Sequence, residues 1–343
     1  MSMLYGFPGE DGLRCSYHGW MFDGTGQCTE MPAEAPDSTF PSRVKIAGYP
    51  AQELGGLVFA YLGPEPAPLL PRWDLLVMGN VVRDIGITEI PCNWLQCMEN
   101  SLDPVHTEWL HGHYYNYVLQ QKAEKDDRGE RFVERITPHH VKIGFDVLEH
   151  GIIKRRVRTG GSEEDDEWKL GHPILFPTIL RVGWTFQIRT PIDDTHTWHV
   201  MYGVYPAPPG ETDFKQGKVP SYDIPMTDED GRHITDFVLG QDMAAWVTQG
   251  PLADRHLERL GESDKGVILY RRMLAEQMAL VEDGGEPVNV FRDPEKNKVI
   301  NIPVEYDLVD TARARRLGSG RAPYSALIDE IEKLWANAPA SAD

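Results

Sequence analysis

One aspartate and two histidines stand close together in the first third of this chain of 343 residues. Asp103, His106 and His111 form a D-x2-H-x4-H pattern. Two neutral imidazoles and a nearby carboxylate are the ligand types that a divalent iron site uses. Histidines at this spacing also occur on surfaces and in cores. The pattern alone is therefore consistent both with an iron site and with histidines that bind no metal.

The backbone decides whether these side chains can meet. Asp103 and His106, three residues apart, share a face of a regular helix. His106 and His111 are five apart, which is roughly 140° around a helix of 3.6 residues per turn. They converge on one ion only if the helix is broken, and Pro104 and Gly112 supply reasons for an irregular backbone. A third ligand must come from elsewhere in the chain.

A second pattern lies near the N-terminus, where Cys15 and His18 form C-x2-H in a glycine-rich stretch. This is half of the ligand set for an iron–sulfur cluster held by two Cys and two His. The other half is missing from the printed chain. The remaining cysteines, Cys28, Cys92 and Cys97, have no partner at a ligand spacing and are expected to be packed thiols.

Charge and composition exclude several classes of partner. The chain has 34 basic and 53 acidic residues, a formal net charge of −19, which argues against nucleic acid and anionic membrane. The first residues have no basic, apolar signal-peptide pattern, and apolar runs such as residues 75–78 are too short to cross a bilayer. We expect a cytoplasmic protein.

The chain divides into two expected domains of different composition. The first ~62 residues are rich in glycine and turns, with a clear strand at residues 57–62, which predicts a small all-β domain. Residues 63–71 form a proline-dense linker. The expected domains are therefore residues 1–70 and 71–343.

Strands and helices are grouped in the second domain, which predicts an α+β fold with helices on one face of an antiparallel sheet. A helix is expected over residues 94–108, kinked at Pro104, and a polar surface loop over residues 204–232. The other expected elements are two strands within 145–157, strands at 179–190 and 197–205, a helix from Ser263 to Gly284, and a final helix at 324–336.

Three motifs, in order, resemble those of one family. N-W-L-Q-x2-E-N-x2-D-P-x-H-x4-H at residues 93–111 resembles the mononuclear-iron motif of the Rieske-type non-haem iron oxygenases. G-L-R-C-S-Y-H-G-W-x-F-D-x2-G at 12–26 resembles their second Rieske motif. Q-D at 241–242, with Q-G-x2-A-D-R at 249–255 and S-D-x-G-V-I at 263–268, resembles the branch containing phthalate dioxygenase and aryl-ether demethylases.

The resemblance implies a role for each matching residue of the iron site. His106 and His111 match the two histidine ligands, and Asp242 matches the carboxylate that completes a facial triad with positions open for O2. Without the resemblance, Asp242 is interpreted as an aspartate in the first turn of a helix, where its negative charge interacts favourably with the helix dipole. Asp103 matches the bridging aspartate, which orients a ligand histidine and reaches the Rieske centre of the neighbouring subunit. Asn100 matches the asparagine beside the site.

The same resemblance implies that Cys15 and His18 are two of the four Rieske [2Fe-2S] ligands. Family members carry a C-x-H motif a short distance upstream, which here falls before Met1. We therefore expect a chain cut short or assigned a late start. As printed, it is not expected to assemble a stable cluster, because two of the four protein ligands are missing.

The predicted protein is the α-subunit of a Rieske-type oxygenase with a helix-grip catalytic domain. It would activate O2 at a mononuclear Fe(II) and hydroxylate or O-demethylate an aromatic compound. Electrons would come from a flavin and iron–sulfur reductase, and the resemblance implies a homotrimer or a multiple of it. Substrate contacts are expected from the sheet around residues 175–189 and from the helix near Asp242.

Two alternatives remain from other classes of protein. One is a non-catalytic remnant that binds a small aromatic ligand, which the missing half-motif favours. The other is a zinc hydrolase, which the x4 spacing and the lack of an H-E-x2-H motif oppose.

Overall fold

The computed structural model describes most of the chain. It covers residues 2–122, 133–134, 136–207, 215–303 and 325. The expected final helix at 324–336 lies outside these residues, apart from Ser325. None of the described helices is long and apolar enough to span a membrane.

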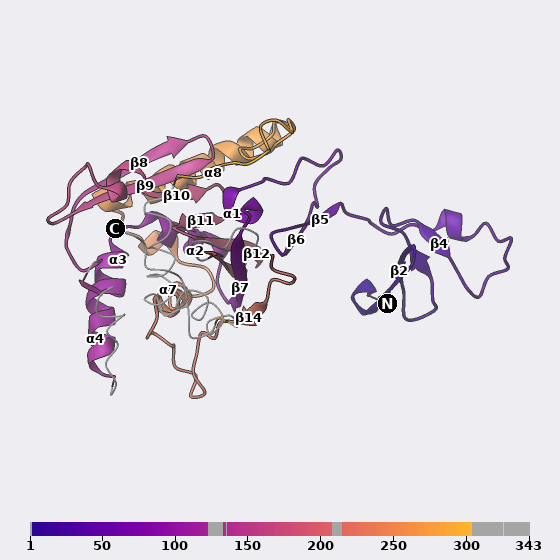
Figure 1. Cartoon of the computed structure of the whole chain (residues 1–343), viewed down its shortest axis with the longest axis horizontal. Helices are drawn as coiled ribbons and strands as arrows, with labels where there is room; N and C mark the ends of the chain where they lie inside the picture. Colours follow the sequence, from indigo (N-terminus) through magenta and orange to yellow (C-terminus); the bar gives the residue numbers. More distant parts are fainter. Residues whose placement is uncertain (1, 123–132, 135, 208–214, 304–324, 326–343) are drawn as a thin grey trace. The chain divides into compact units, whose positions relative to one another are not determined.

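The chain forms two compact units (Figure 1). The first comprises Met1–Leu70 and Phe291–Pro294, and the second comprises Pro71–Val290 and Glu295–Asp343. The division follows the proline-dense segment. The short return of the chain at Phe291–Pro294 had no signal in the sequence; it joins the first unit through an antiparallel bridge between Leu69 and Phe291.

The first unit is a small β structure, as its glycine-rich sequence predicts. Its helical turns and strands are η1 (Met3–Tyr5), β1 (Phe7–Gly9), β2 (Gly12–Arg14), β3 (Met21–Phe22), β4 (Cys28–Glu30), η2 (Pro41–Arg43), β5 (Ala51–Leu54) and β6 (Leu57–Ala60). Strands β1 to β4 form one antiparallel sheet in sequence order, and β5 and β6 form a hairpin. Phe22, Cys28 and Met31 are its buried core.

The second unit is built on an eight-stranded sheet in the order β14-β7-β13-β12-β11-β10-β9-β8. These strands are β7 (Val81–Ile90), β8 (His140–Leu148), β9 (Gly151–Arg158), β10 (His172–Leu175), β11 (Ile179–Val182), β12 (Thr185–Asp193), β13 (His196–Pro206) and β14 (Ser221–Asp223). Every pair is antiparallel except β14 with β7, which is parallel. The sheet is therefore mixed, and the expected loop at 204–232 contains an edge strand.

The single strand expected over residues 179–190 is wrong. Two strands, β11 and β12, form a hairpin in which Val182 faces Thr185. The turn between them contains Gly183 at φ 52°, a conformation that costs glycine little.

The helices of the second unit supply the site and cover the sheet. They are α1 (Asp74–Val77), α2 (Trp94–Leu102), α3 (His106–Glu108), a π-helix η3 (Trp109–Tyr114), α4 (Tyr115–Gln120), α6 (Asp166–Lys169), α7 (Val238–Val247), η4 (Arg255–Leu257), η5 (Glu262–Asp264) and α8 (Lys265–Glu282). Helix α8 has Asp264 as its N-cap rather than Ser263, and it ends before Gly284 at φ 81°.

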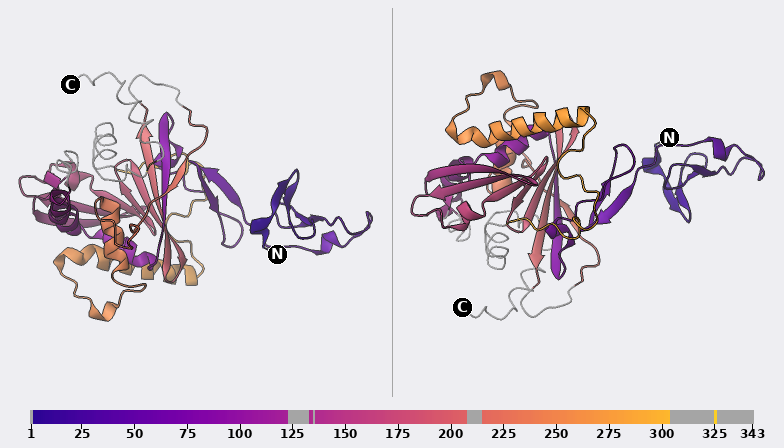
Figure 2. Two further views of the ribbon diagram at one scale, coloured as in Figure 1. Left: turned by 90° about the horizontal axis from the view of Figure 1, so that it is seen from below. Right: turned by 90° about the horizontal axis from the view of Figure 1, so that it is seen from above.

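Two buried clusters show that α2, α7 and α8 pack on one face of the sheet (Figure 2). In the first, Met98 and Leu102 of α2 and Tyr270 of α8 meet Ile152 and Ile174 of the strands.

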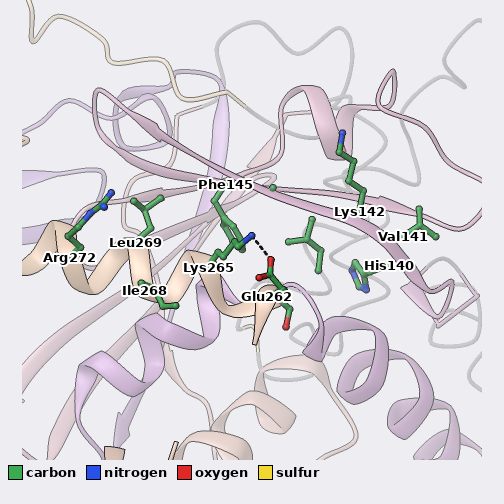
Figure 3. A pocket seen from close by; sticks show the side chains of 12 residues that line it. His140, Val141, Lys142, Phe145, Glu262, Lys265, Ile268, Leu269 and Arg272 are labelled. Atoms are coloured by element: carbon green, nitrogen blue, oxygen red, sulfur yellow. Dashed lines mark ion pairs between the residues drawn. The ribbon is translucent and has the colours of Figure 1, made fainter. Parts of the chain in front are cut away.

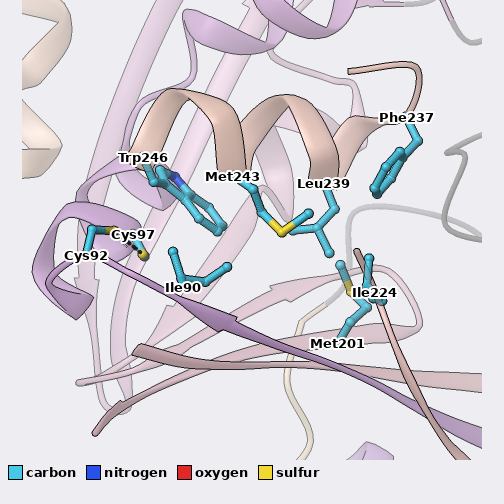
Figure 4. Close-up of a cluster of buried hydrophobic side chains, with 9 residues drawn as sticks. All are labelled: Ile90, Cys92, Cys97, Met201, Ile224, Phe237, Leu239, Met243 and Trp246. Carbon is cyan, nitrogen blue, oxygen red and sulfur yellow. Dashed lines mark hydrogen bonds between the residues drawn. The ribbon is translucent and has the colours of Figure 1, made fainter. Parts of the chain in front are cut away.

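In the second cluster the side chains of α7 face the strands (Figure 4). Met243 and Trp246 of α7 pack with Ile90 of β7 and with Cys92 and Cys97. The two thiols are buried with their Sγ atoms 3.8 Å apart, in agreement with the prediction of packed cysteines.

Pro104 separates two helices rather than kinking one. Helix α2 ends at Leu102, and Asp103 is extended at φ −87° and ψ 117°. A proline disfavours helical backbone at the residue before it, which explains the break. Helix α3 then starts at His106, so the helix predicted over 94–108 is interrupted at residues 103–105.

Candidate metal centre

Three side chains from two separate segments meet in the second unit. His106 lies on α3, His111 on the π-helix and Asp242 on α7. The Nε2 atoms of His106 and His111 are 3.7 and 3.2 Å from Asp242 Oδ1. One ligand atom from each of the three lies within 4.8 Å of the others. The group predicted from sequence is therefore brought together.

The π-helix explains how histidines five residues apart converge. Residues 109–114 form this wider turn, whose hydrogen bonds join residues five apart. Residues at that spacing therefore lie nearly above one another, and the rings of His106 and His111 have centroids 5.0 Å apart. The predicted irregular backbone is present, but it is a widened helix rather than a break between the two histidines.

A glutamine fixes the orientation of His111. Gln241 Nε2 donates to the Thr235 carbonyl (2.9 Å), so its Oε1 is left to accept from His111 Nδ1 (2.9 Å). Nδ1 therefore carries a proton, and Nε2 is the ring nitrogen that faces Asp242. A ligand histidine with this second hydrogen bond is typical of metal sites.

Asp103 does the same for His106. Its Oδ2 is 3.3 Å from His106 Nδ1 and 3.2 Å from the His106 backbone N–H, while Oδ1 accepts from the Val105 N–H (2.7 Å). Both histidines thus point Nε2 into the same space. Asp103 remains 31% exposed at its side chain, so part of the carboxylate is open to another molecule.

Asp242 is buried and ionised. Burial raises its pKa, but the charge and hydrogen bond of His111 and the charge of His106 outweigh that effect, so the pKa stays below its usual value. Asp242 is in the second turn of α7, beyond the first turn where the helix-dipole reading would place it. Asn100 Nδ2 lies 3.4 Å from its Oδ1. This anionic oxygen with two neutral imidazole nitrogens fits a ferrous ion.

Glu108 is a further buried acid that sequence reasoning missed. It accepts from His139 Nδ1 (2.9 Å), His140 Nδ1 (2.9 Å) and the His140 backbone N–H (3.0 Å). Burial opposes its charge, but these hydrogen bonds lower its pKa to about 2. The contacts tie α3, which carries His106, to the start of β8. The sequence around Glu108 does not indicate these hydrogen bonds, because the two histidines lie 31 and 32 residues away.

Cys15 and His18 lie in the turn between β2 and β3 of the first unit. The Cys15 N–H donates to the Trp20 carbonyl (2.8 Å), and Gly19, at φ 75°, donates to the Cys15 carbonyl (3.0 Å). Cys15 is half-buried and His18 exposed. The turn therefore holds both residues at the surface, where a cluster could be shared with further ligands. Cys28, by contrast, is buried in the core.

The F-D-x2-G part of the same motif has a structural role. Asp23 Oδ1 accepts from the N–H groups of Thr25 (2.8 Å) and Gln27 (3.0 Å). Gly26 closes the turn at φ 83°, where a Cβ would stand 2.1 Å from the Ile46 carbonyl oxygen. Only glycine fits there.

A cavity of about 610 Å³ lies elsewhere, between β8 and the first half of α8 (Figure 3). Its wall combines basic and apolar side chains, among them Lys142, Phe145, Lys265, Ile268 and Arg272. No triad residue lines it, so it is not part of the candidate metal centre.

Comparison with known proteins agrees with this site. Residues 2–50 match the Rieske [2Fe-2S] domain family, and residues 226–301 match the family described as LigXa C-terminal domain like. The 5,5'-dehydrodivanillate O-demethylase oxygenase subunit of Sphingobium sp. (strain NBRC 103272 / SYK-6) is 39% identical over 304 residues, covering 88% of this chain and 69% of that protein. The phthalate 4,5-dioxygenase oxygenase subunit of Pseudomonas putida is 29% identical, covering 83% and 71%.

The fold is also that of a solved relative. NdmA of Pseudomonas putida CBB5 superposes with a TM-score of 0.55 at 17% identity, over 83% of this chain and 76% of that one. The chain belongs to the Rieske non-haem iron oxygenases, in the branch that resembles phthalate dioxygenase. It is an oxygenase subunit of that family, which disfavours the zinc hydrolase and the non-catalytic remnant.

Proposed function

We propose that His106, His111 and Asp242 hold one ferrous ion, at which this subunit oxidises an aromatic compound with O2. The main support is the orientation of the two imidazoles. Their Nδ1 atoms hydrogen-bond to Asp103 and Gln241, so both Nε2 atoms face the Asp242 carboxylate. A zinc hydrolase would need a general base beside the metal, and among the described residues we find no second carboxylate in this group.

The iron and the residues around the triad would have separate roles. The bound iron would supply the binding and reductive activation of O2, with three protein ligands leaving room for it. Asp103 and Gln241 hold the two imidazoles in the tautomer that can ligate. Asn100 is close enough to Asp242 Oδ1 to restrain that carboxylate. Helices α2, α7 and α8 pack on one face of the sheet, and the packing of α8 there supports the helix-grip description.

The relatives' names suggest the substrate class. They include oxygenase subunits named for phthalate, phenoxybenzoate, 3-chlorobenzoate and 5,5'-dehydrodivanillate. We infer an aromatic substrate for this chain, with either hydroxylation or O-demethylation as the outcome.

Electron supply and assembly are proposed on the same basis. Cys15 and His18 would hold one side of a Rieske cluster, which a flavin and iron–sulfur reductase would reduce. We propose a homotrimer or a multiple of it, in which the partly exposed Asp103 carboxylate contacts the cluster domain of a neighbouring subunit.

Two alanine variants on the same turn test the iron site. His111→Ala removes a buried ligand, whereas His113→Ala removes an exposed histidine that contacts Trp109 on the same π-helix. We expect His111→Ala to lose mononuclear iron, measured by metal analysis after desalting, and His113→Ala to keep it. Full iron occupancy in a folded His111→Ala protein would refute the assignment.

A further inference from the structure

One lysine of the second unit is buried beside the segment that carries the two histidines of the triad. Lys154 on β9 is 4% exposed, whereas every other lysine in the described part of the chain is exposed. Removing an ammonium group from water costs free energy, and lysine is almost never buried unless its charge is compensated. The surroundings of Lys154 must therefore offset a cost that a neutral side chain at this position would not have.

The alternation of side chains along β9 brings Lys154 to the end of α2. Ile152 and Lys154 are two residues apart on the strand, so their side chains point to the same face of the sheet. Ile152 packs in the core cluster that contains Met98 of α2. Lys154 Nζ donates to the backbone carbonyl of Asp103 (3.3 Å), the residue that ends this helix. The ammonium group therefore lies where α2 meets the ligand segment.

A structural role accounts for part of this arrangement. The carbonyl groups at the C-terminal end of a helix carry partial negative charge and interact favourably with a cation. Helix α2 has no basic residue in its own last turn, and Lys154 supplies one from the neighbouring strand. A neutral donor could satisfy the same carbonyl, however, so the hydrogen bond alone does not require a buried charge.

The charge of Lys154 acts on groups at the triad. Burial opposes the charge of Asp103, but the hydrogen bond and charge of His106, and also the charge of Lys154, lower its pKa. Burial lowers the pKa of His111 and Lys154 acts in the same direction, although the charge and hydrogen bond of Asp242 outweigh both. The field of this ammonium group therefore reaches one histidine of the triad and the carboxylate that orients the other.

A fixed positive charge affects the two oxidation states of a bound iron ion unequally. Ferric iron carries one more positive charge than ferrous iron, so a nearby ammonium group destabilises the ferric state more. We propose that Lys154 favours the ferrous state of the iron at the triad, through a buried positive charge held at the C-terminal end of α2. The inference rests on the proposed function, which requires ferrous iron. A lysine with a purely structural role would affect folding but not the balance between the two oxidation states.

Three replacements separate the charge from the hydrogen bond. Lys154→Arg keeps the charge, Lys154→Gln keeps a donor without the charge, and Lys154→Met removes both. The iron-loaded full chain would be titrated anaerobically with a chemical reductant and redox mediators, and ferric iron would be followed by electron paramagnetic resonance.

The measured quantity is the ratio of ferrous to ferric iron at a fixed solution potential. We expect this ratio to fall about tenfold in Lys154→Gln and Lys154→Met, the order of effect that one unit charge has over roughly 10 to 15 Å at an effective dielectric constant of about 20. Lys154→Arg should stay within about threefold of the parent, because its side chain is always charged.

Controls separate the electrostatic effect from folding. Lys142→Met removes an exposed lysine from the neighbouring strand β8 and should keep the ratio of the parent, because solvent and salt screen an exposed charge. The thermal midpoints of the metal-free proteins identify the variants that fold. A ratio within about twofold of the parent in a folded neutral variant, or an equal fall in Lys154→Arg, would overturn the proposal. Failure of both neutral variants to fold would also overturn it, by assigning Lys154 a structural role. Iron content of the parent, and its loss in His111→Ala, report separately on the proposed function.

Discussion

Replacement of Gln241 by methionine tests how the protein prepares His111 for a metal. Methionine has a similar length but cannot accept the proton of His111 Nδ1. Gln241 and His111 are 0% and 5% exposed, and the hydrogen bond between them is 2.9 Å long, so water does not replace the lost acceptor.

The expected magnitude follows from that burial. With iron on Nε2, the Nδ1–H of the variant is left without a partner, which costs about 1–3 kcal/mol. Loss of such a supporting contact typically weakens metal binding by about 10- to 100-fold. The two ranges agree, since tenfold in affinity is about 1.4 kcal/mol. We therefore expect the Fe(II) dissociation constant to rise by about one to two orders of magnitude.

A chelator competition under anaerobic conditions would measure this constant. Gln249→Met is the matched control, because Gln249 lies just past the end of α7, is exposed, and its side chain donates only to the Ala245 carbonyl. It should bind iron like the parent. The thermal midpoint of the metal-free proteins separates a loss of affinity from a loss of folding. A Gln241→Met protein that folds and binds iron within about twofold of the parent would refute the role given to Gln241.

Two other predictions concern the neighbours of the triad. In protein that carries both the mononuclear iron and the Rieske cluster, Asp103→Asn should keep the content of both. It should slow the reoxidation of a pre-reduced cluster by O2 and substrate, because the carboxylate that bridges the subunits is lost. Unchanged reoxidation would contradict a bridging role for Asp103. Burial lowers the pKa of His140 to about 4, so the unfolded state binds more protons between roughly pH 6.5 and 4 and stability falls as pH drops through that window. Between pH 7.5 and 5, urea unfolding should show that His140 lowers the free energy of unfolding by about 2 kcal/mol, and His140→Asn should remove this loss. An unchanged pH dependence in that variant would show that His140 is not the group responsible. The depressed pKa of Glu108, about 2, adds a loss in the same direction, but only below roughly pH 4.5.

Local rules predicted the parts of the site that depend on neighbouring residues. The sequence predicted irregular backbone at Pro104, as a kink within one helix; the structure instead ends α2 at Leu102, because a proline disfavours helical backbone at the residue before it. The motif spacing placed His106 and His111 on one segment. The resemblance to the oxygenase family supplied Asp242, which no spacing rule could connect to them across more than 130 residues of chain.

Features that depend on tertiary packing were not predictable. Propensity does not distinguish a π-helix at 109–114 from an α-helix, because the two differ only in whether a backbone N–H bonds to the carbonyl five or four residues earlier. Of the two partners of Glu108, His140 begins β8 and His139 precedes it, whereas the sequence placed the first strand here only from residue 145. Arg189 and His199 are polar residues of strands, and no local rule predicts their complete burial, because only the helices packed on that face make them interior.

The central claim is that His106, His111 and Asp242 bind one ferrous ion. Anomalous diffraction at the iron edge, from crystals of the iron-loaded protein, tests it most directly. The account predicts one mononuclear peak within bonding distance of both Nε2 atoms and of the Asp242 carboxylate. A peak elsewhere, or none at these three residues in protein that contains mononuclear iron, would contradict it.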